Sequence, residues 1–325
     1  MERWVFWANF LCVVISGCAS EPVPDPGAEM PVSAAPTPAS EALPAVIVAD
    51  RSGFIPEGVE YDMANGRLLT GSLSEGSVFE IGPNGQVTEF VTDTDLVSSV
   101  GIEADEAYGR LFVANADRSV FQGEGQGQAK LGVYDLSTGS RLAMVDLAST
   151  VNDPPADAAY FANDVAVADN GTAYVTDTRL SVIYEVSTDY EASLLHRFDD
   201  GGSGPNGIVY HPAGFLLVAR GSTLWKVPVD NPEASSEVSV PEEITGQDGM
   251  VWSAMRLVIV SNDANRVVAL RSDDEWGTAE VVAVGTYEPQ ATTAAVVGDA
   301  IYVVHPHFAD DDPPSVSLVE LQQYL

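Results

Sequence analysis

Apolar and polar residues of positions 46–325 follow the short pattern of β-strands, and no segment shows a sustained helical period. Six apolar runs each follow turn residues, mostly Gly, Asn or Asp: 68–69, 111–114, 173–176, 215–218, 257–260 and 301–304. Because hairpin turns favour these residues, each run is predicted to be the second strand of a hairpin. In at least five cases a third apolar strand follows: 77–81, 131–135, 182–186, 223–227 and 266–270.

The hairpins repeat in phase. A residue at the start of each first strand is followed, fourteen positions later, by a residue just past the second strand. The start positions are Glu57, Gly101, Asn163, Asn206, Asp248 and Ala291. The exit positions are Gly71, Asn115, Asp177, Arg220, Asn262 and His305. Consecutive start positions are 44, 62, 43, 42 and 43 residues apart.

Four-stranded units at this spacing are typical of β-propellers. The sequence therefore predicts an all-β fold, a six-bladed β-propeller with four-stranded blades over 46–325. A β-sandwich is the alternative, and six in-phase hairpins argue against it. The long step contains two predicted surface loops, 121–130 and 151–160, the second close to the propeller mouth. Strands at 45–49 and 315–322 are expected to close the ring.

The first eighteen residues are predicted to be an export signal. The apolar run of Trp4–Ile15 is too short to span a bilayer as a mature helix. The following Ile15-Ser16-Gly17-Cys18 resembles the lipobox of bacterial lipoproteins, which implies lipidation of Cys18; an ordinary secretory signal is the alternative. Without an aspartate after Cys18, we expect an envelope lipoprotein, in the outer membrane if the cell is Gram-negative. Residues 19–45, rich in Pro, Ala and Ser, are predicted to form a disordered tether.

The exported domain would have neither a disulfide nor thiol chemistry, because the second cysteine, Cys12, lies in the signal segment. Its 280 residues suffice for one well-buried domain. The formal net charge is −34, which argues against nucleic acid as a partner. Such a charge serves solubility, and it also attracts cations to a carboxylate-lined pocket.

Four start positions carry oxygen ligands: Glu57, Asn163, Asn206 and Asp248. The start of an inner strand and the exit of its neighbour lie on one face of a propeller, so these residues should surround one opening. Two carboxylates and two amide carbonyls suit a hard divalent cation, with Ca²⁺ first and other divalent cations possible. Zinc fits less well, because the four histidines do not cluster at ligand spacing. Taken alone, Asn206-Gly207 and Asp248-Gly249 are ordinary turn dipeptides.

These motifs resemble those of the SMP-30/gluconolactonase/LRE family of calcium-dependent six-bladed hydrolases, which has phosphotriesterase-like relatives. The resemblance covers 46–325. The matching motifs are Ile55-Pro56-Glu57-Gly58, Asn163-Asp164-Val165-Ala166-Val167, Gly204-Pro205-Asn206-Gly207-Ile208 and Gln247-Asp248-Gly249-Met250. The resemblance implies that Glu57, Asn163, Asn206 and Asp248 hold a catalytic calcium. A strictosidine-synthase-like protein is a weaker option, since such proteins need not keep the four ligands.

The substrate rim departs from the family. Sugar-lactone members tend to have an arginine two residues before the first asparagine, where this chain has Phe161, so the substrate is expected to be a more apolar lactone or ester. Arg220 is a candidate partner for a substrate carboxylate or oxyanion, or else a rim ion pair. Asp177 is expected to cap its exit turn, with support of the site as the alternative. Asn262 completes the predicted rim.

His305 occupies the place of a metal-near histidine in phosphotriesterase-like relatives, and is a candidate proton shuttle or a packed rim residue. We expect the substrate on the open side beneath Gly101 and Ala291. The predicted function is hydrolysis of a small lactone or ester by a monomer, with Asp248 as general base or nucleophile. A non-catalytic, surface-tethered binding propeller with a structural metal is the alternative.

Overall fold

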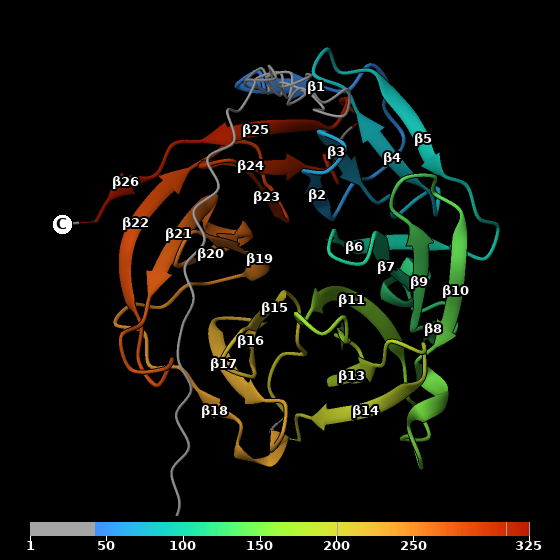
Figure 1. Ribbon diagram of the computed structural model, residues 1–325, viewed down its shortest axis with the longest axis vertical. Helices are drawn as coiled ribbons and strands as arrows, with labels where there is room; N and C mark the ends of the chain where they lie inside the picture. Colours follow the sequence, from blue (N-terminus) through green and yellow to red (C-terminus); the bar gives the residue numbers. More distant parts are fainter. Residues whose placement is uncertain (1–42, 200, 310, 325) are drawn as a thin grey trace, which may run out of the picture. The chain divides into compact units, whose positions relative to one another are not determined.

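The computed structural model describes residues 43–199, 201–309 and 311–324. In this part of the chain, β-strands form six sheets around a central axis (Figure 1). The remaining regular elements are four short 3-10 helices: η1 (Arg118–Gln122), η2 (Ala148–Thr150), η3 (Pro232–Ala234) and η4 (Asn262–Ala264). The predicted all-β six-bladed propeller is confirmed.

Each blade begins with its innermost strand. Blade 1 comprises β2 (Val59–Asp62), β3 (Arg67–Thr70), β4 (Val78–Ile81) and β5 (Val87–Val91). Blade 2 comprises β6 (Ser98–Asp105), β7 (Arg110–Ala116), β9 (Lys130–Asp135) and β10 (Arg141–Asp146). Blade 3 comprises β11 (Tyr160–Val167), β12 (Ala173–Asp177), β13 (Val182–Val186) and β14 (Ala192–Arg197), with β8 (Gly127–Gln128) added to β11.

The other three blades follow the same plan. Blade 4 comprises β15 (Ile208–His211), β16 (Phe215–Arg220), β17 (Thr223–Pro228) and β18 (Ser236–Glu237). Blade 5 comprises β19 (Gln247–Ser253), β20 (Arg256–Ser261), β21 (Arg266–Arg271), β22 (Glu280–Thr286) and β26 (Gln322–Gln323). Blade 6 comprises β23 (Ala294–Val297), β24 (Ala300–His305), β25 (Ser315–Val319) and β1 (Val46–Val48).

The ring is closed by the two ends of the described chain. Strand β1 pairs antiparallel with β25 as the outer strand of blade 6, as predicted, and β26 extends blade 5. Contacts with blade 6 already begin at Leu43, three residues before the predicted domain start, because the Tyr302 hydroxyl donates a hydrogen bond of 2.9 Å to its carbonyl oxygen. The chain ends are therefore held by backbone pairing rather than by a disulfide.

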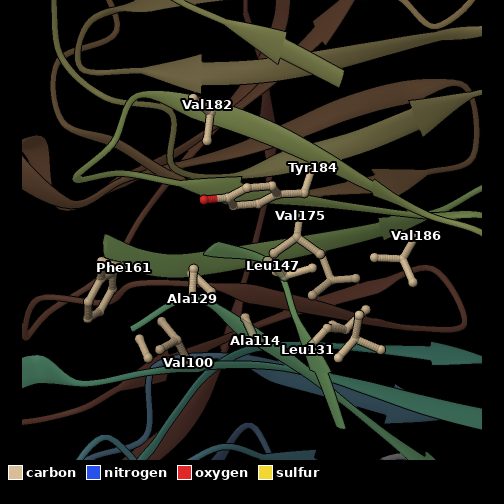
Figure 2. Close-up of a cluster of buried hydrophobic side chains, with 14 of the residues drawn as sticks. Val100, Ala114, Ala129, Leu131, Leu147, Phe161, Val175, Val182, Tyr184 and Val186 are labelled. Carbon is tan, nitrogen blue, oxygen red and sulfur yellow. The ribbon is translucent and has the colours of Figure 1, made fainter. Parts of the chain in front are cut away.

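Apolar side chains between neighbouring sheets form the core. Figure 2 shows the cluster between blades 2 and 3, in which Ala114 and Leu131 of blade 2 face Val175 and Val182 of blade 3. Burial on both faces explains why the second strands read as continuous apolar runs rather than as alternating ones.

One predicted loop differs from the structure, and the predicted N-terminal segments lie largely outside the described residues. The 121–130 insertion is not only a loop, because its β8 pairs parallel with Tyr160 and Phe161 of β11. The predicted export signal and residues 19–42 of the tether lie outside the described residues. Among the residues that are described, no helix is long and apolar enough to cross a membrane.

Candidate metal site at the strand starts

The start and exit positions of each blade lie beside each other, as the fourteen-residue repeat predicts. In blade 4, the backbone N–H of Asn206 donates a hydrogen bond of 2.9 Å to the backbone carbonyl oxygen of Ala219, the residue before Arg220. In blade 5, the Asn262 side chain reaches Asp248 directly, with a hydrogen bond of 2.6 Å. The candidate ligands and the exit residues therefore share one face of the propeller.

Three inner strands carry a register shift at this face. The shift lies between Ala162 and Val165 in β11 and between Gln247 and Met250 in β19, so it contains Asn163 and Asp248. A third shift in β6 contains Gly101. Such bulges bend a strand and re-aim its side chains. The local irregularity thus turns the start residues away from the ordinary alternation of the strand.

Glycines behind the start residues allow the neighbouring inner strand to approach closely. A Cβ atom at Gly58 would lie 2.6 Å from the carbonyl oxygen of Val100 in blade 2. At Gly207 a Cβ atom would overlap the Asp248 carbonyl oxygen of blade 5. Neither glycine has a positive φ. The Glu57-Gly58 and Asn206-Gly207 pairs are therefore close-contact pairs at strand starts, not turn dipeptides.

The two candidate carboxylate ligands are buried and close enough to repel each other. Burial, followed by repulsion from Asp248 and Asp164, raises the pKa of Glu57 well above its ordinary value. Burial also raises the pKa of Asp248 to about 7, although hydrogen bonds from Asn262 and Asn206 oppose the shift. Without a cation, the site favours the protonated forms, and a bound cation would favour the charged ones.

Among the described residues, none donates a hydrogen bond to the side-chain oxygen of Asn163, Oδ1. Its amide nitrogen donates a hydrogen bond of 2.8 Å to the Thr178 hydroxyl, which in turn donates one of 2.7 Å to the Pro205 carbonyl oxygen. Because the Thr178 hydroxyl already donates to Pro205, it can only accept from Asn163, so the Asn163 side-chain oxygen points away from Thr178. The residue is only 6% exposed, and its Oδ1 atom is buried without a hydrogen-bond partner. A buried amide oxygen of this kind is costly unless a ligand completes it.

The donor set fits a hard cation that accepts mixed oxygen ligands. Glu57 and Asp248 supply carboxylates, and Asn163 and Asn206 supply amide oxygens, as Ca²⁺ favours. Among the described residues, no group of three or more His, Cys, Asp or Glu side chains is placed to hold a metal. A metal at this site would therefore depend on the two asparagines for half of its protein ligands.

A third carboxylate, Asp164, was not recognised from the sequence. It accepts backbone hydrogen bonds from Val165, at 2.9 Å, and Ile208, at 3.2 Å. Burial raises its pKa to about 7. Its position directly after Asn163 was visible, but only the register shift places both side chains at the site.

Asp164 and Asn163 also pack closely against Gly101, one of the two start positions without a ligand side chain. A Cβ atom at Gly101 would lie 2.7 Å from both the Asp164 Cα atom and the Asn163 carbonyl oxygen. Ala291 is completely buried. Both start positions that lack a ligand are therefore packed against neighbouring backbone or buried, and the expectation of substrate on this side of the site stays a prediction.

The four predicted rim residues have different surroundings. Asn262 contacts Asp248, as described above. Asp177 is fully buried and accepts backbone hydrogen bonds from Phe161, Arg179 and Leu180, all within 3.0 Å, as expected for a cap of the exit turn. Thus the Asn262 side chain directly contacts a candidate ligand, whereas the Asp177 carboxylate caps the turn that follows its own strand.

Phe161 and Arg220 are both packed. Phe161 contacts Phe121 edge-on, with ring centroids 4.7 Å apart. The Arg220 guanidinium lies 4.0 Å from the centroid of the Phe198 ring, and its Nε donates to the Ser203 carbonyl oxygen at 3.0 Å. Their roles towards a substrate remain predictions.

His305 is 1% exposed, and both of its ring nitrogens are engaged. Nδ1 lies 2.8 Å from the Pro289 carbonyl oxygen and Nε2 lies 2.7 Å from the Ser317 hydroxyl. Burial lowers the pKa of the imidazole, although the Gln290 and Pro289 carbonyls oppose the shift. This geometry describes a neutral, packed histidine, and its role as a proton shuttle stays a prediction.

No known family profile matches the chain, and no curated protein sequence matches it. Solved structures do match. The major allergen Mala s 1 of Malassezia sympodialis has a TM-score of 0.68 at 18% identity, over 86% of this chain and 97% of that one. The chain belongs, by its fold, to the class of six-bladed β-propellers.

Two further matches are named for calcium and for lactone chemistry. The calcium-binding protein regucalcin of Agrobacterium tumefaciens has a TM-score of 0.59 at 17% identity, over 87% of this chain and 96% of that one. A gluconolactonase of Xanthomonas campestris has a TM-score of 0.56 at 15% identity, over 86% and 99%. At these identities the likeness establishes the fold alone.

Proposed function

We propose that this protein is a calcium-dependent hydrolase of a lactone or a related ester, with its metal at the strand-start site. The observation that carries the proposal is the buried Oδ1 atom of Asn163, which has no hydrogen-bond partner among the described residues. Asn163 lies at the same strand-start face as the buried carboxylates of Glu57 and Asp248. The names of the regucalcin and gluconolactonase structures are consistent with it.

Glu57, Asn163, Asn206 and Asp248 would hold the cation. When bound, Ca²⁺ would supply electrostatic stabilisation for the negative charge that develops on the ester carbonyl oxygen. The Thr178–Pro205 hydrogen-bond chain would keep the Asn163 oxygen turned towards the cation. The Asn262 amide would hold one Asp248 oxygen, Oδ2, in place.

Asp248 would then act through its other oxygen. As a general base, it would take a proton from a water molecule while the water oxygen bonds to the carbonyl carbon. The bond to the leaving oxygen would break, and that oxygen would receive a proton. As a nucleophile, Asp248 would itself bond to the carbonyl carbon while the bond to the leaving oxygen breaks and that oxygen takes a proton from solvent. Water would then cleave the resulting acyl anhydride and restore the Asp248 carboxylate. Label from ¹⁸O-labelled water that appears in Asp248 would establish the nucleophilic route, because a general base exchanges no oxygen, whereas water attack on the anhydride at the Asp248 carboxyl carbon does.

The direct test is turnover on a panel of aliphatic and aromatic lactones and aryl esters, with and without a calcium chelator. We expect activity on at least one apolar substrate, loss of activity in chelator, and loss in Asp248→Asn. Asp189→Asn, an exposed turn aspartate, is the matched control and should keep full activity. Turnover that survives both chelator and Asp248→Asn would contradict the proposal.

The alternative is a non-catalytic binding propeller whose metal only stabilises the fold. The match to an allergen, with a higher TM-score than the two named above for calcium or lactone chemistry, keeps this alternative open. Calcium that raises the melting temperature without hydrolysis of any substrate on the panel would favour it.

We also propose that Cys18 is lipidated and that the protein is an envelope lipoprotein, attached to the membrane only through that lipid. The proposal rests on the sequence motif at 15–18. Mass spectrometry of the N-terminal peptide should find an acylated Cys18, and Cys18→Ser should release the protein from the membrane fraction. An unmodified Cys18 in the membrane-bound protein would contradict this.

A further inference from the structure

The hairpin-tip face, opposite the strand starts, carries a cavity of about 540 Å³ over blades 3 to 5. Aromatic side chains dominate its wall: Tyr210, His211, Trp252 and Trp276. The side chain of Met255, 85% exposed, forms part of the rim, and the exposed carboxylate of Asp169 lies there as well. Met255 thus extends a wall in which Tyr210, His211 and Trp252 are each half-buried, and a continuous apolar surface of this kind is typical of a binding site.

The rings are held in place by one another and by the backbone. The Trp252 indole nitrogen donates a hydrogen bond of 2.8 Å to the Tyr210 carbonyl oxygen. The Trp252 ring meets Trp276 and His211 edge-on, with centroid distances of 5.6 and 5.5 Å. Tyr210 stacks on Tyr174 at 6.1 Å. The cavity wall is thus a preformed aromatic surface.

A smaller chamber of about 220 Å³ adjoins this cavity within the inner strands. The two share Val167, Tyr210 and Trp252 in their walls. The chamber also contains the carboxylates of Glu60 from blade 1 and Glu103 from blade 2. Within the described part of the chain, neither carboxylate has an arginine, lysine or histidine nitrogen within 4.0 Å.

We propose that this cavity and chamber bind an organic ammonium ion with apolar substituents, such as a quaternary ammonium compound. The cationic head would lie between the two carboxylates and the rings of Tyr210 and Trp252, and the apolar part would lie in the wider aromatic cavity. Aromatic faces attract weakly hydrated cations of this kind, most strongly when the cation is removed from water. The net charge of −34 favours the approach of a cation.

An inorganic cation fits the chamber less well. Apart from Glu60, Glu103 and Tyr210, the side chains that line it are apolar or aromatic and supply no further oxygen ligands for a metal ion. A Ca²⁺ ion takes six to eight oxygen ligands. A primary ammonium group has three N–H donors to satisfy, and methyl groups in their place would match the apolar walls.

The state of the carboxylates is consistent with this assignment. Burial raises the pKa of Glu60 to about 8, and burial with repulsion from Glu60 raises the pKa of Glu103 well above its ordinary value. A cation bound between them would lower both pKa values, because opposite charge favours the ionised form.

The test is calorimetric titration at pH 8.5 with choline and with 3,3-dimethylbutan-1-ol, its uncharged analogue of the same shape. We expect choline to bind at least about tenfold more tightly than the alcohol. This comparison uses the wild-type protein alone, so it does not depend on any variant. Equal binding of the two, or no binding of choline at about 100 mM, which corresponds to about −1.4 kcal/mol, would overturn the proposal.

Variants locate the site. Glu60→Gln and Glu103→Gln should each weaken choline binding by about fivefold or more and leave the alcohol unaffected. Glu191→Gln, at an exposed position on blade 3, should change neither. Tighter binding of ethanolamine than of choline would overturn the choice of a quaternary ion. Calcium binding that disappears in Glu60→Gln, in place of choline binding, would overturn the choice of an organic one.

Discussion

Asn262 and Asp248 are fourteen residues apart, and the Asn262 side-chain amide donates a hydrogen bond of 2.6 Å to Oδ2 of Asp248. The bond joins the exit position of blade 5 to its start position. It stabilises the charged form of a buried carboxylate, and hydrogen bonds to charged groups contribute about 1.5–3 kcal/mol.

Replacement of Asn262 should therefore weaken calcium binding. We expect Asn262→Ala to raise the calcium dissociation constant by about tenfold, because the Asp248 carboxylate loses the donor that orients it and lowers its pKa. Calorimetric titration of chelator-treated protein measures this. Asn115→Ala is the matched control, because Asn115 is the exit position of blade 2, where the start position is Gly101. An equal effect of both variants would contradict a direct role for Asn262.

Thr178 should determine which atom of Asn163 faces the site. Thr178→Val removes the hydroxyl that accepts from the Asn163 amide nitrogen and donates to Pro205. We expect calcium affinity to fall by about tenfold, since the amide is no longer held with its oxygen outwards. Thr178→Ser keeps the hydroxyl and should retain the affinity. Calcium affinity that is the same in both variants would show that the orientation of Asn163 does not matter.

Gly101 should be intolerant of a side chain. A Cβ atom there would lie 2.7 Å from the Asp164 Cα atom and the Asn163 backbone carbonyl oxygen. An alanine at this position could therefore be accommodated only if the backbone of blade 2 or blade 3 moved. We expect Gly101→Ala to lower the free energy of unfolding by about 1–3 kcal/mol. Gly277→Ala is the control, because its nearest neighbour would be a flexible Asp274 carboxylate oxygen at 3.3 Å. Urea unfolding at constant pH compares them, and equal midpoints would contradict the close packing at Gly101.

The periodicity of apolar residues was sufficient to predict the fold. The apolar second strands and their turns predicted all six hairpins, because burial on both faces leaves a continuous apolar run that is easy to recognise. Most pairing is between neighbours in the sequence, and the one predicted long-range contact, between the two end strands, is confirmed by the antiparallel pairing of β1 with β25.

The site was less predictable than the fold. Phase alone selected Glu57, Asn163, Asn206 and Asp248, but it could not show that Asp164 shares the site, because that depends on a register shift in β11. It also could not show that Arg220 lies against the Phe198 ring or that His305 has both nitrogens engaged. These arrangements depend on side-chain packing between blades. Glu60 and Glu103 were missed because nothing in their local sequence distinguishes a channel-facing carboxylate from a solvated one.

Glu60 should make the protein less stable as pH rises. Burial, with repulsion from Glu106 and Asp164, raises its pKa from 4.5 to about 8. The folded protein thus holds this proton more tightly than the unfolded chain. The contribution to stability is complete below pH 4.5 and is lost as pH rises through 8.

Urea unfolding of wild-type protein and Glu60→Gln at pH 5, 6.5 and 8 tests this dependence. Because a glutamine side chain cannot ionise, we expect the variant to gain stability relative to wild type as pH rises. Glu191→Gln should show no such trend. If the stability of the wild type rose relative to that of Glu60→Gln between pH 5 and 8, the raised pKa of Glu60 would be contradicted.

In the proposed function, one cation held by the four start residues supports hydrolysis. The most direct test follows turnover and calcium binding together, in chelator-treated protein, as free calcium is raised. We predict one binding site, half-saturation of binding and turnover at the same calcium concentration, and an equal shift of both, by about tenfold or more, in Asn163→Leu. Turnover that is independent of calcium, or an Asn163→Leu variant that binds calcium and turns over as the wild type does, would contradict the account.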